Sequence, residues 1–171
     1  MIIRRVAVVG IVLAGMLALG GCDGSPAPAA STPPFASEEE AFAAAEETYR
    51  AYVDALNAER SKVQPARGSR DYLTGAALKE DLGTDDILAE RGWTIIGESH
   101  ITGFTGEKST SNSVGALVCV DASATRVLDA TGQDVTPPDR DVRTSLVVEF
   151  VPSESGLLIA HSAIAEESIC E

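Results

Sequence analysis

The chain has 171 residues, of which 44% are hydrophobic and 23% are charged, and its formal net charge is −13. This length is enough for one domain with its own hydrophobic core. The acidic balance argues against a nucleic-acid-binding protein, because phosphates are bound by basic surfaces, and against docking on anionic lipid headgroups.

Residues 1–21 have the features of an export signal. Arg4 and Arg5 form a short basic start, and the uncharged run 6–19 (VAVVGIVLAGMLAL) has the length of a signal-peptide hydrophobic region. A spanning helix needs about 20 apolar residues, so this run is too short to cross a bilayer comfortably. The residues around the arginine pair lack the usual features of a twin-arginine signal, which favours general secretion.

The hydrophobic run ends in Leu19, Gly20, Gly21 and Cys22. A leucine at this position suits an apolar pocket of a processing enzyme, and the two glycines leave an unhindered backbone for cleavage. The stretch 1–22 resembles bacterial lipoprotein signal peptides. This resemblance implies cleavage before Cys22 and attachment of diacylglyceryl and palmitate chains there, which would hold the protein on the extracytoplasmic face of the cell membrane. The alternative is an ordinary secretory signal with an incidental cysteine.

Residues 22–36 are expected to form a lipidated cysteine and a tether. The segment 23–36 (DGSPAPAASTPPFA) is rich in Pro, Ala and Ser, and an extended chain of this composition reaches roughly 40 Å. The folded domain is therefore expected to cover 37–171 and to stand off the membrane. We interpret its excess of acid as a solubility feature, with a cationic partner as the alternative.

A long helix is predicted over about 38–60. Ser37 and Glu40 match a capping box, and the acidic first turn suits the positive end of the helix dipole. Apolar residues then recur at three- and four-residue spacing, which is typical of an amphipathic helix. We expect its aromatic residues to be core, with a ligand-cavity lining as the alternative. The recurring positions are Phe42, Ala45, Tyr49, Tyr52, Val53 and Leu56.

Two short helices are expected next. The segment 64–68 (QPARG) breaks the helical pattern. A first short helix is predicted over 76–82 and is expected to stop at Gly83. Thr84 is expected to cap a second one, which ends at Gly92.

From Trp93 onward the sequence predicts strands. Helices followed by a four- to six-stranded antiparallel meander are an α+β pattern. Segment 126–129 is interpreted as the continuation of the second strand after a bulge or turn, 130–133 as a turn, 136–141 as a solvated loop and 152–156 as a hairpin connection. The main strands are expected at 93–102, 113–121, 142–151 and 157–165.

Besides Cys22, only Cys119 and Cys170 remain. An exported chain with one remaining pair is expected to form one disulfide. It would close a loop of about 50 residues, for which the chain-entropy model gives up to about 4 kcal/mol. The alternative is two free buried thiols. No zinc site or other cofactor is expected, because His100 and His161, the only histidines, have no closely spaced ligand partner.

A set of further features occurs together: a proline-rich tether after Cys22, the segment 72–75 (YLTG), Trp93 at the start of the strands, the segment 118–121 (VCVD) and a terminal Cys170. In these features the chain resembles uncharacterised actinobacterial lipoproteins, and its element order resembles the cystatin-like, nuclear-transport-factor-like fold. The resemblance implies a long N-terminal helix and short helices packed on a curved antiparallel sheet. It implies no activity, and it places the disulfide between an inner strand and the C-terminal end of the sheet.

The main functional expectation is a membrane-anchored cell-envelope lipoprotein with a non-catalytic binding or interaction module. Its partner would be an envelope protein or a small apolar ligand. A third possibility is a subunit of an envelope complex, and proteins of this fold also form homodimers through the sheet.

The alternative is an enzyme of the ketosteroid-isomerase-like or polyketide-cyclase-like type, acting on a small apolar substrate. Such enzymes place an Asp general base between helix and sheet. Candidate groups here are Asp54, His100, Asp121 and His161. They form no recognisable constellation, so we interpret each as a surface residue or a hydrogen-bonded polar residue.

The lipid attachment gives a first testable prediction. Replacement Cys22→Ala should move the protein from the membrane fraction to the soluble fraction, because two acyl chains, at about 0.8 kcal/mol per buried methylene, supply the membrane affinity. Fractionation of cells that express the variant and the wild type measures this. Continued membrane retention of the variant would contradict the lipoprotein interpretation.

Overall fold

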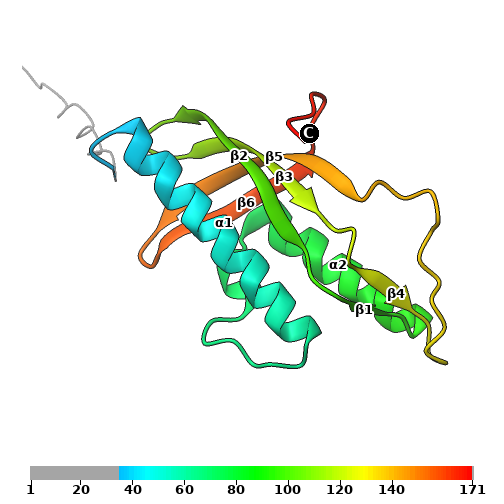
Figure 1. The fold of residues 1–171 in the computed structure, drawn as a ribbon. Coiled ribbons are helices and arrows are strands. Elements are labelled where there is room, and N and C mark those ends of the chain that lie inside the picture. The colour runs from blue at the N-terminus through cyan, green and yellow to red at the C-terminus, as the bar shows by residue number, and fades with distance from the viewer. Residues whose placement is uncertain (1–34, 171) are drawn as a thin grey trace, which may run out of the picture. The chain divides into compact units, whose positions relative to one another are not determined.

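The computed structural model describes residues 35–170, which form an α+β domain with a curved antiparallel sheet (Figure 1). The expected signal peptide, Cys22 and most of the expected tether lie outside the described residues. Among residues 35–170, no helix combines the length and the hydropathy needed to cross a bilayer.

Helix α1 covers Glu38–Arg60, as the apolar spacing predicts. The Ser37 hydroxyl accepts a hydrogen bond from the Glu40 amide at 3.2 Å. The Glu40 carboxylate accepts from the Ala36 amide at 2.8 Å, so the reciprocal bond of the expected capping box falls one residue earlier. The stripe that faces the core contains Ala41, Ala45, Tyr49 and Val53.

Helix α2 is one continuous helix over Gly75–Arg91, so the expected pair of short helices is wrong. Gly83 lies in its interior, where glycine costs only about 1 kcal/mol relative to alanine and does not break the backbone hydrogen bonds. The Thr84 hydroxyl donates to the Glu80 carbonyl at 2.9 Å instead of capping a new helix. The helix ends as predicted at Gly92, whose φ of 64° is a left-handed cap.

The main sheet has four antiparallel strands in the order β2-β3-β5-β6. Strand register pairs Val118 with Phe104 on one side and with Leu146 on the other. The strands are β2 (His100–Ser109), β3 (Val114–Asp121), β5 (Arg143–Ser153) and β6 (Gly156–Ile164).

A second, two-stranded sheet pairs β1 (Thr94–Ile96) with β4 (Arg126–Leu128), so two expectations are corrected. The single strand expected over 93–102 divides at Gly97, where φ is +81° and an added Cβ would lie 2.2 Å from the Ala124 carbonyl oxygen. Segment 126–129 does not continue β3 but pairs with β1. The small sheet lies along the C-terminal half of α2 (Figure 1).

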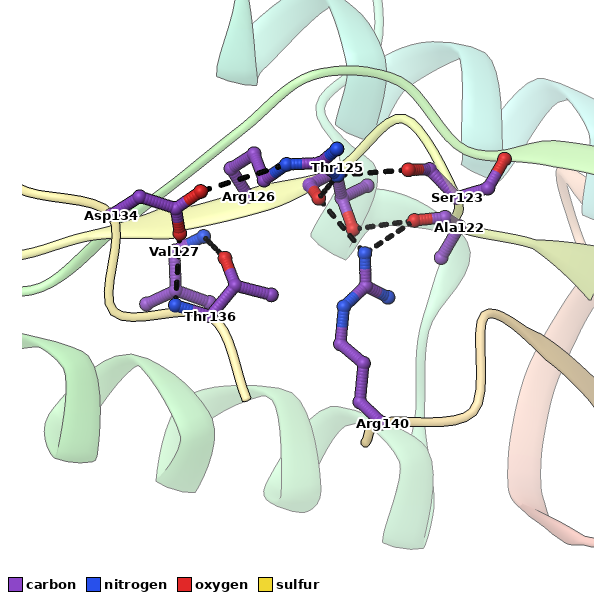
Figure 2. Close-up of polar contacts among 8 residues, drawn as sticks. All are labelled: Ala122, Ser123, Thr125, Arg126, Val127, Asp134, Thr136 and Arg140. Atoms are coloured by element: carbon purple, nitrogen blue, oxygen red, sulfur yellow. Dashed lines mark hydrogen bonds and ion pairs between the residues drawn. The ribbon is translucent and has the colours of Figure 1, made fainter. Parts of the chain in front are cut away.

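The loop that follows β4 is attached to this small sheet (Figure 2). The Arg140 guanidinium donates from Nη2 to the carbonyls of Ala122 and Thr125, each at 2.9 Å. The Thr136 hydroxyl accepts from the Val127 amide at 2.8 Å. The loop expected to be only solvated therefore fixes the connection between β3 and β4 through buried and half-buried backbone groups.

The hydrophobic core lies between α1 and the main sheet. The start of α2 is attached to this core, because the Thr74 amide donates to the Ile159 carbonyl at 2.9 Å and Leu73 forms a β-bridge with Ile159. Each fully buried aliphatic or aromatic side chain contributes about 1.5–3 kcal/mol. The largest fully buried apolar side chains are Phe150, Ile159, Val114, Val118 and Val148.

The disulfide between Cys119 and Cys170 is present, as predicted. Cys119 lies on the inner strand β3 and is only 1% exposed, and its Sγ accepts a hydrogen bond from the Thr102 hydroxyl at 3.0 Å. Next to the second cysteine, the Ile169 amide donates to the Ser145 hydroxyl at 2.7 Å. The disulfide therefore secures a C-terminal segment that has few other attachments.

Loss of this disulfide should lower stability. In Cys170→Ser the unfolded chain regains the entropy of a loop with a sequence separation of 51 residues. We expect the free energy of unfolding to fall by about 2–4 kcal/mol, measured by urea unfolding. The wild type in reductant is the matched control and should fall by a similar amount. Equal stability of the variant and the oxidised wild type would contradict the expectation.

Candidate functional site

A cleft with a volume of ≈ 920 Å³ lies between α1, α2, β1 and β6. This volume is within the range of small-molecule sites, which is about 300–1,000 Å³. The C-terminal half of α1 forms one wall. Its lining side chains are Tyr49, Tyr52, Leu56, Glu59 and Arg60.

The opposite wall comes from α2 and the residues that follow it. Trp93, the only tryptophan of the chain, lies half-buried here, and the Arg91 guanidinium stacks over its ring at 4.5 Å from the centroid. The wall is thus apolar near the small sheet and charged along α2. Its lining side chains are Ala77, Glu80, Asp81, Leu82, Thr84, Asp85, Asp86, Leu88, Ala89, Trp93, Thr94 and Ile95.

Two tyrosines stand side by side in the α1 wall. The rings of Tyr49 and Tyr52 meet edge to face at 5.7 Å, and Tyr49 also meets Phe150 at 6.3 Å. Burial, with the neighbouring Tyr52, raises the pKa of Tyr49 well above its ordinary value, and a hydrogen bond with the Ser162 hydroxyl opposes this shift. Burial, with the negative charge of Asp81, raises the pKa of Tyr52 to about 12. Both hydroxyls therefore stay protonated at neutral pH and can donate hydrogen bonds.

Several carboxylates of the cleft are already hydrogen-bonded by the protein. Glu59 accepts from the Ser69 amide at 2.8 Å and from the Ser69 hydroxyl at 2.7 Å, which attaches the 3₁₀ helix η1 (Ser69–Tyr72) to α1. Asp81 accepts from Arg70 Nε at 2.7 Å, and Asp85 pairs with the same guanidinium. These groups hold the two helices and η1 together at the mouth of the cleft.

Two cations of the cleft, Arg60 and Lys62, form no ion pair within residues 35–170, and of these Arg60 is half-buried whereas Lys62 is exposed. Burial lowers the pKa of the Arg60 guanidinium. Nη1 donates to the Ser99 hydroxyl at 3.0 Å. Within residues 35–170, no carboxylate forms an ion pair with Arg60.

None of the four candidate catalytic residues lines this cleft. Asp54 and His100 are exposed and border a separate pocket of ≈ 160 Å³ between α1 and β2. His100 and Asp121 are register partners across β2 and β3, and His161 lies half-buried on β6. Asp121 pairs with Arg143 at 2.9 Å, and hydrogen bonds from Ser123, with that ion pair, lower its pKa to about 2.

The structure therefore brings Asp54, His100 and Asp121 to the same end of the sheet, but outside the cleft and without a shared hydrogen bond. In the part of the chain that the structure describes, no three His, Cys, Asp or Glu side chains are placed to hold a metal ion. Cys22, the expected lipidation site, lies outside the described residues.

Arg60 was not among the residues predicted for a site. The sequence contains a pattern that could have identified it. Arg60 continues the three- and four-residue spacing of Tyr49, Tyr52 and Leu56, so it lies on the same face at the end of α1. Trp93 was assigned only to the start of the strands. No local pattern relates it to α1, and only the path of α2 brings it to the same cleft.

Ionisation of the buried tyrosines gives a pH prediction. The pKa of Tyr52 is 10 in its ordinary state and about 12 in the folded protein, so its contribution to stability is complete below pH 10 and is lost between pH 10 and 12. In Tyr52→Phe the free energy of unfolding should fall less steeply over that interval. Urea unfolding of the variant and the wild type at pH 8 and at points between pH 10 and 12 measures this. The difference in their free energies of unfolding at pH 8, where Tyr52 is protonated in both states, is the control. Parallel pH profiles would contradict it.

No protein-family model matches the chain, and no curated protein matches its sequence. Solved structures match at low similarity. The intermembrane space region of the chloroplast protein ARC6 has 16% identity and a TM-score of 0.44, covering 69% of this chain and 94% of that one. A putative aromatic ring hydroxylase from Novosphingobium aromaticivorans has 13% identity and a TM-score of 0.47, covering 72% and 86%. Aln2 from a Streptomyces species has 11% identity and a TM-score of 0.45, covering 78% and 93%. Similarity at this level does not extend to function.

Proposed function

We propose that this chain is a cell-envelope lipoprotein, attached through lipid on Cys22, whose nuclear-transport-factor-like domain binds a small molecule in the cleft between α1 and α2. The single observation that carries the binding function is the cleft itself, with ≈ 920 Å³ and the side chains of Tyr52, Leu56, Trp93 and Ile95 along its walls. Apolar walls with placed polar groups are usual in ligand sites, and in this cleft the apolar side chains lie beside charged residues of α1 and α2.

Binding is favoured over catalysis by the state of the cleft carboxylates. A general base must be within hydrogen-bond reach of the proton that it removes. Both oxygens of Glu59 accept hydrogen bonds from Ser69, and Asp81 and Asp85 are paired with Arg70. The enzyme alternative would have to break one of these interactions or use Glu80 or Asp86, which line the cleft but are exposed to solvent.

A small ligand is favoured over a protein partner by the distribution of exposed apolar side chains. Protein interfaces are marked by contiguous apolar patches. Among the described residues, the large exposed apolar side chains are spread over several elements and loops and form no single strand or helix face. They are Val63, Leu82, Ile87, Ile96, Val142 and Ile164.

The location would follow from the leader and the tether. The formal net charge of −13 disfavours contact with anionic headgroups, so the lipid on Cys22 would supply the membrane affinity. The domain would then meet ligands on the extracytoplasmic side.

Tryptophan fluorescence can test the binding function. We expect at least one of three water-soluble adamantane probes (1-adamantanecarboxylate, 1-adamantanecarboxamide and 1-adamantanamine) to change Trp93 emission saturably. The full chain, purified as exported and placed in phosphatidylcholine vesicles, is the sample, and protein-free vesicles with a tryptophan analogue correct for partitioning.

Two matched acidic substitutions, one inside the cleft and one outside it, test whether the fluorescence change comes from a probe bound in the cleft. Leu56→Asp should weaken probe binding by about tenfold or more, because a carboxylate would replace an apolar wall group. Ile164→Asp, at a position on β6 that is 78% exposed and outside the cleft, is the control and should bind like the wild type. Circular dichroism verifies the fold of both. No response to any probe, or equal loss in both folded variants, would refute binding in this cleft.

A further inference from the structure

Arg60 is a cation placed where a cation is costly. It is the last residue of α1, it lines the cleft, and its side chain is half-buried among Tyr52, Leu56 and neighbouring cleft residues. Withdrawing a charge from water is unfavourable unless a partner compensates it. A guanidinium has five N–H donors, and the protein acceptor found for Arg60 is the neutral Ser99 hydroxyl at 3.0 Å.

The position of this guanidinium is prepared by its neighbours. Asn57, one helical turn before Arg60, accepts from the Ser99 amide at 3.0 Å and donates to the Ser99 carbonyl at 2.8 Å. Ser99 is itself buried, with 8% exposure. Asn57 therefore holds both the amide and the carbonyl of Ser99, and this positions the Ser99 hydroxyl that accepts from Arg60. The hydroxyl in turn orients the Arg60 guanidinium, although it carries no charge.

The other charges of the cleft are either paired or exposed. Lys62 also lines the cleft and forms no ion pair among the described residues, but it is exposed to solvent. Glu59 is bound by Ser69, and Asp81 and Asp85 are bound by Arg70. Glu80 and Asp86 are exposed on α2 and contact the solvent. The half-buried part of the cleft thus presents an unmatched positive charge next to an aromatic and aliphatic surface.

We propose that the ligand of this cleft is an amphipathic organic anion, a carboxylic or sulfonic acid with a hydrocarbon or ring body, whose acidic group is bound by Arg60. This rests on the proposed function of the cleft. Arginine matches two oxygens of one acidic group, and a charge-assisted hydrogen bond is stronger than a neutral one. The Tyr52 hydroxyl, protonated at neutral pH, supplies a further donor in the same wall.

The overall charge of the protein sharpens this inference. With a formal net charge of −13, the protein as a whole repels anions. At physiological salt the Debye length is about 8 Å, so acids outside the cleft are largely screened. Within the cleft, Glu59, Asp81 and Asp85 are compensated by Ser69 and Arg70. A preference for anions would therefore arise from Arg60 and not from the general field.

The three adamantane probes test the charge preference, because they share one apolar body. On the wild type, Trp93 fluorescence titrations should give the tightest binding for 1-adamantanecarboxylate, about tenfold tighter than for the isosteric 1-adamantanecarboxamide, with 1-adamantanamine weakest. A charge-assisted hydrogen bond accounts for a difference of this size. This comparison needs no mutation and does not depend on the folding of a variant.

Variants then assign the preference to one residue. In Arg60→Gln the carboxylate should lose its advantage over the carboxamide, whereas binding of the carboxamide should change little. Arg60→Lys keeps the charge but not the paired geometry, so it should retain part of the advantage. The control is Arg50→Gln on the same helix, where Arg50 pairs with Glu46 at 2.7 Å outside the cleft, and it should keep the full advantage.

The outcomes separate this inference from the proposed function. Equal affinity for carboxylate and carboxamide, or a preference for the amine, would overturn the anion proposal and leave a cleft that binds small molecules. A carboxylate preference that survives in folded Arg60→Gln would overturn the role of Arg60. Absence of any saturable response to all three probes would refute binding in the cleft.

Discussion

Packing of α1 on the main sheet is the interaction on which the rest of this structure depends. The Phe42 ring packs on Gly106 of β2, where an added Cβ would lie 2.3 Å from the ring. Glycine at this point lets the helix lie directly on the strand, next to a register shift that bends β2. Below this contact, Ala45 and Tyr49 continue the helix stripe into the core. The direction of α1, and hence the position of its C-terminal half, follows from this contact.

The same apolar stripe serves two purposes along its length. In the first half of α1 it is covered by the sheet and contributes to the core. In the second half Tyr52, Leu56 and Arg60 face the cleft instead, because α2 leaves β6 and runs beside them without closing the space. The pairing of Arg70 with Asp81 and the attachment of Glu59 to Ser69 connect η1 to both helices. A ligand site and a core are therefore built from one periodic pattern.

Much of the fold was predictable because it depends on short-range patterns. The bounds of α1, the strands β3, β5 and β6, the glycine cap of α2 and the disulfide were all expected and are present. Two of the errors concern glycines. Gly83 was expected to end a helix that continues, and Gly97 ends a strand that was expected to continue. A glycine permits both outcomes, and contacts with distant residues select one. Two other errors are the part of β2 beyond Thr102, which was not expected, and segment 126–129, which was expected to continue β3. The signal peptide and the lipid on Cys22 stay predictions.

By itself the sequence determined that helices come before strands, the core stripe of α1 and the one available cysteine pair, since these follow from periodicity, capping residues and composition. Only the tertiary structure decided that Arg60 and Trp93 share a cleft, that β1 and β4 form a sheet of their own, and that Asp54, His100 and Asp121 lie outside the cleft. The physical reason is that each of these facts depends on the path of α2 and on packing between residues far apart in the chain, which no local pattern records.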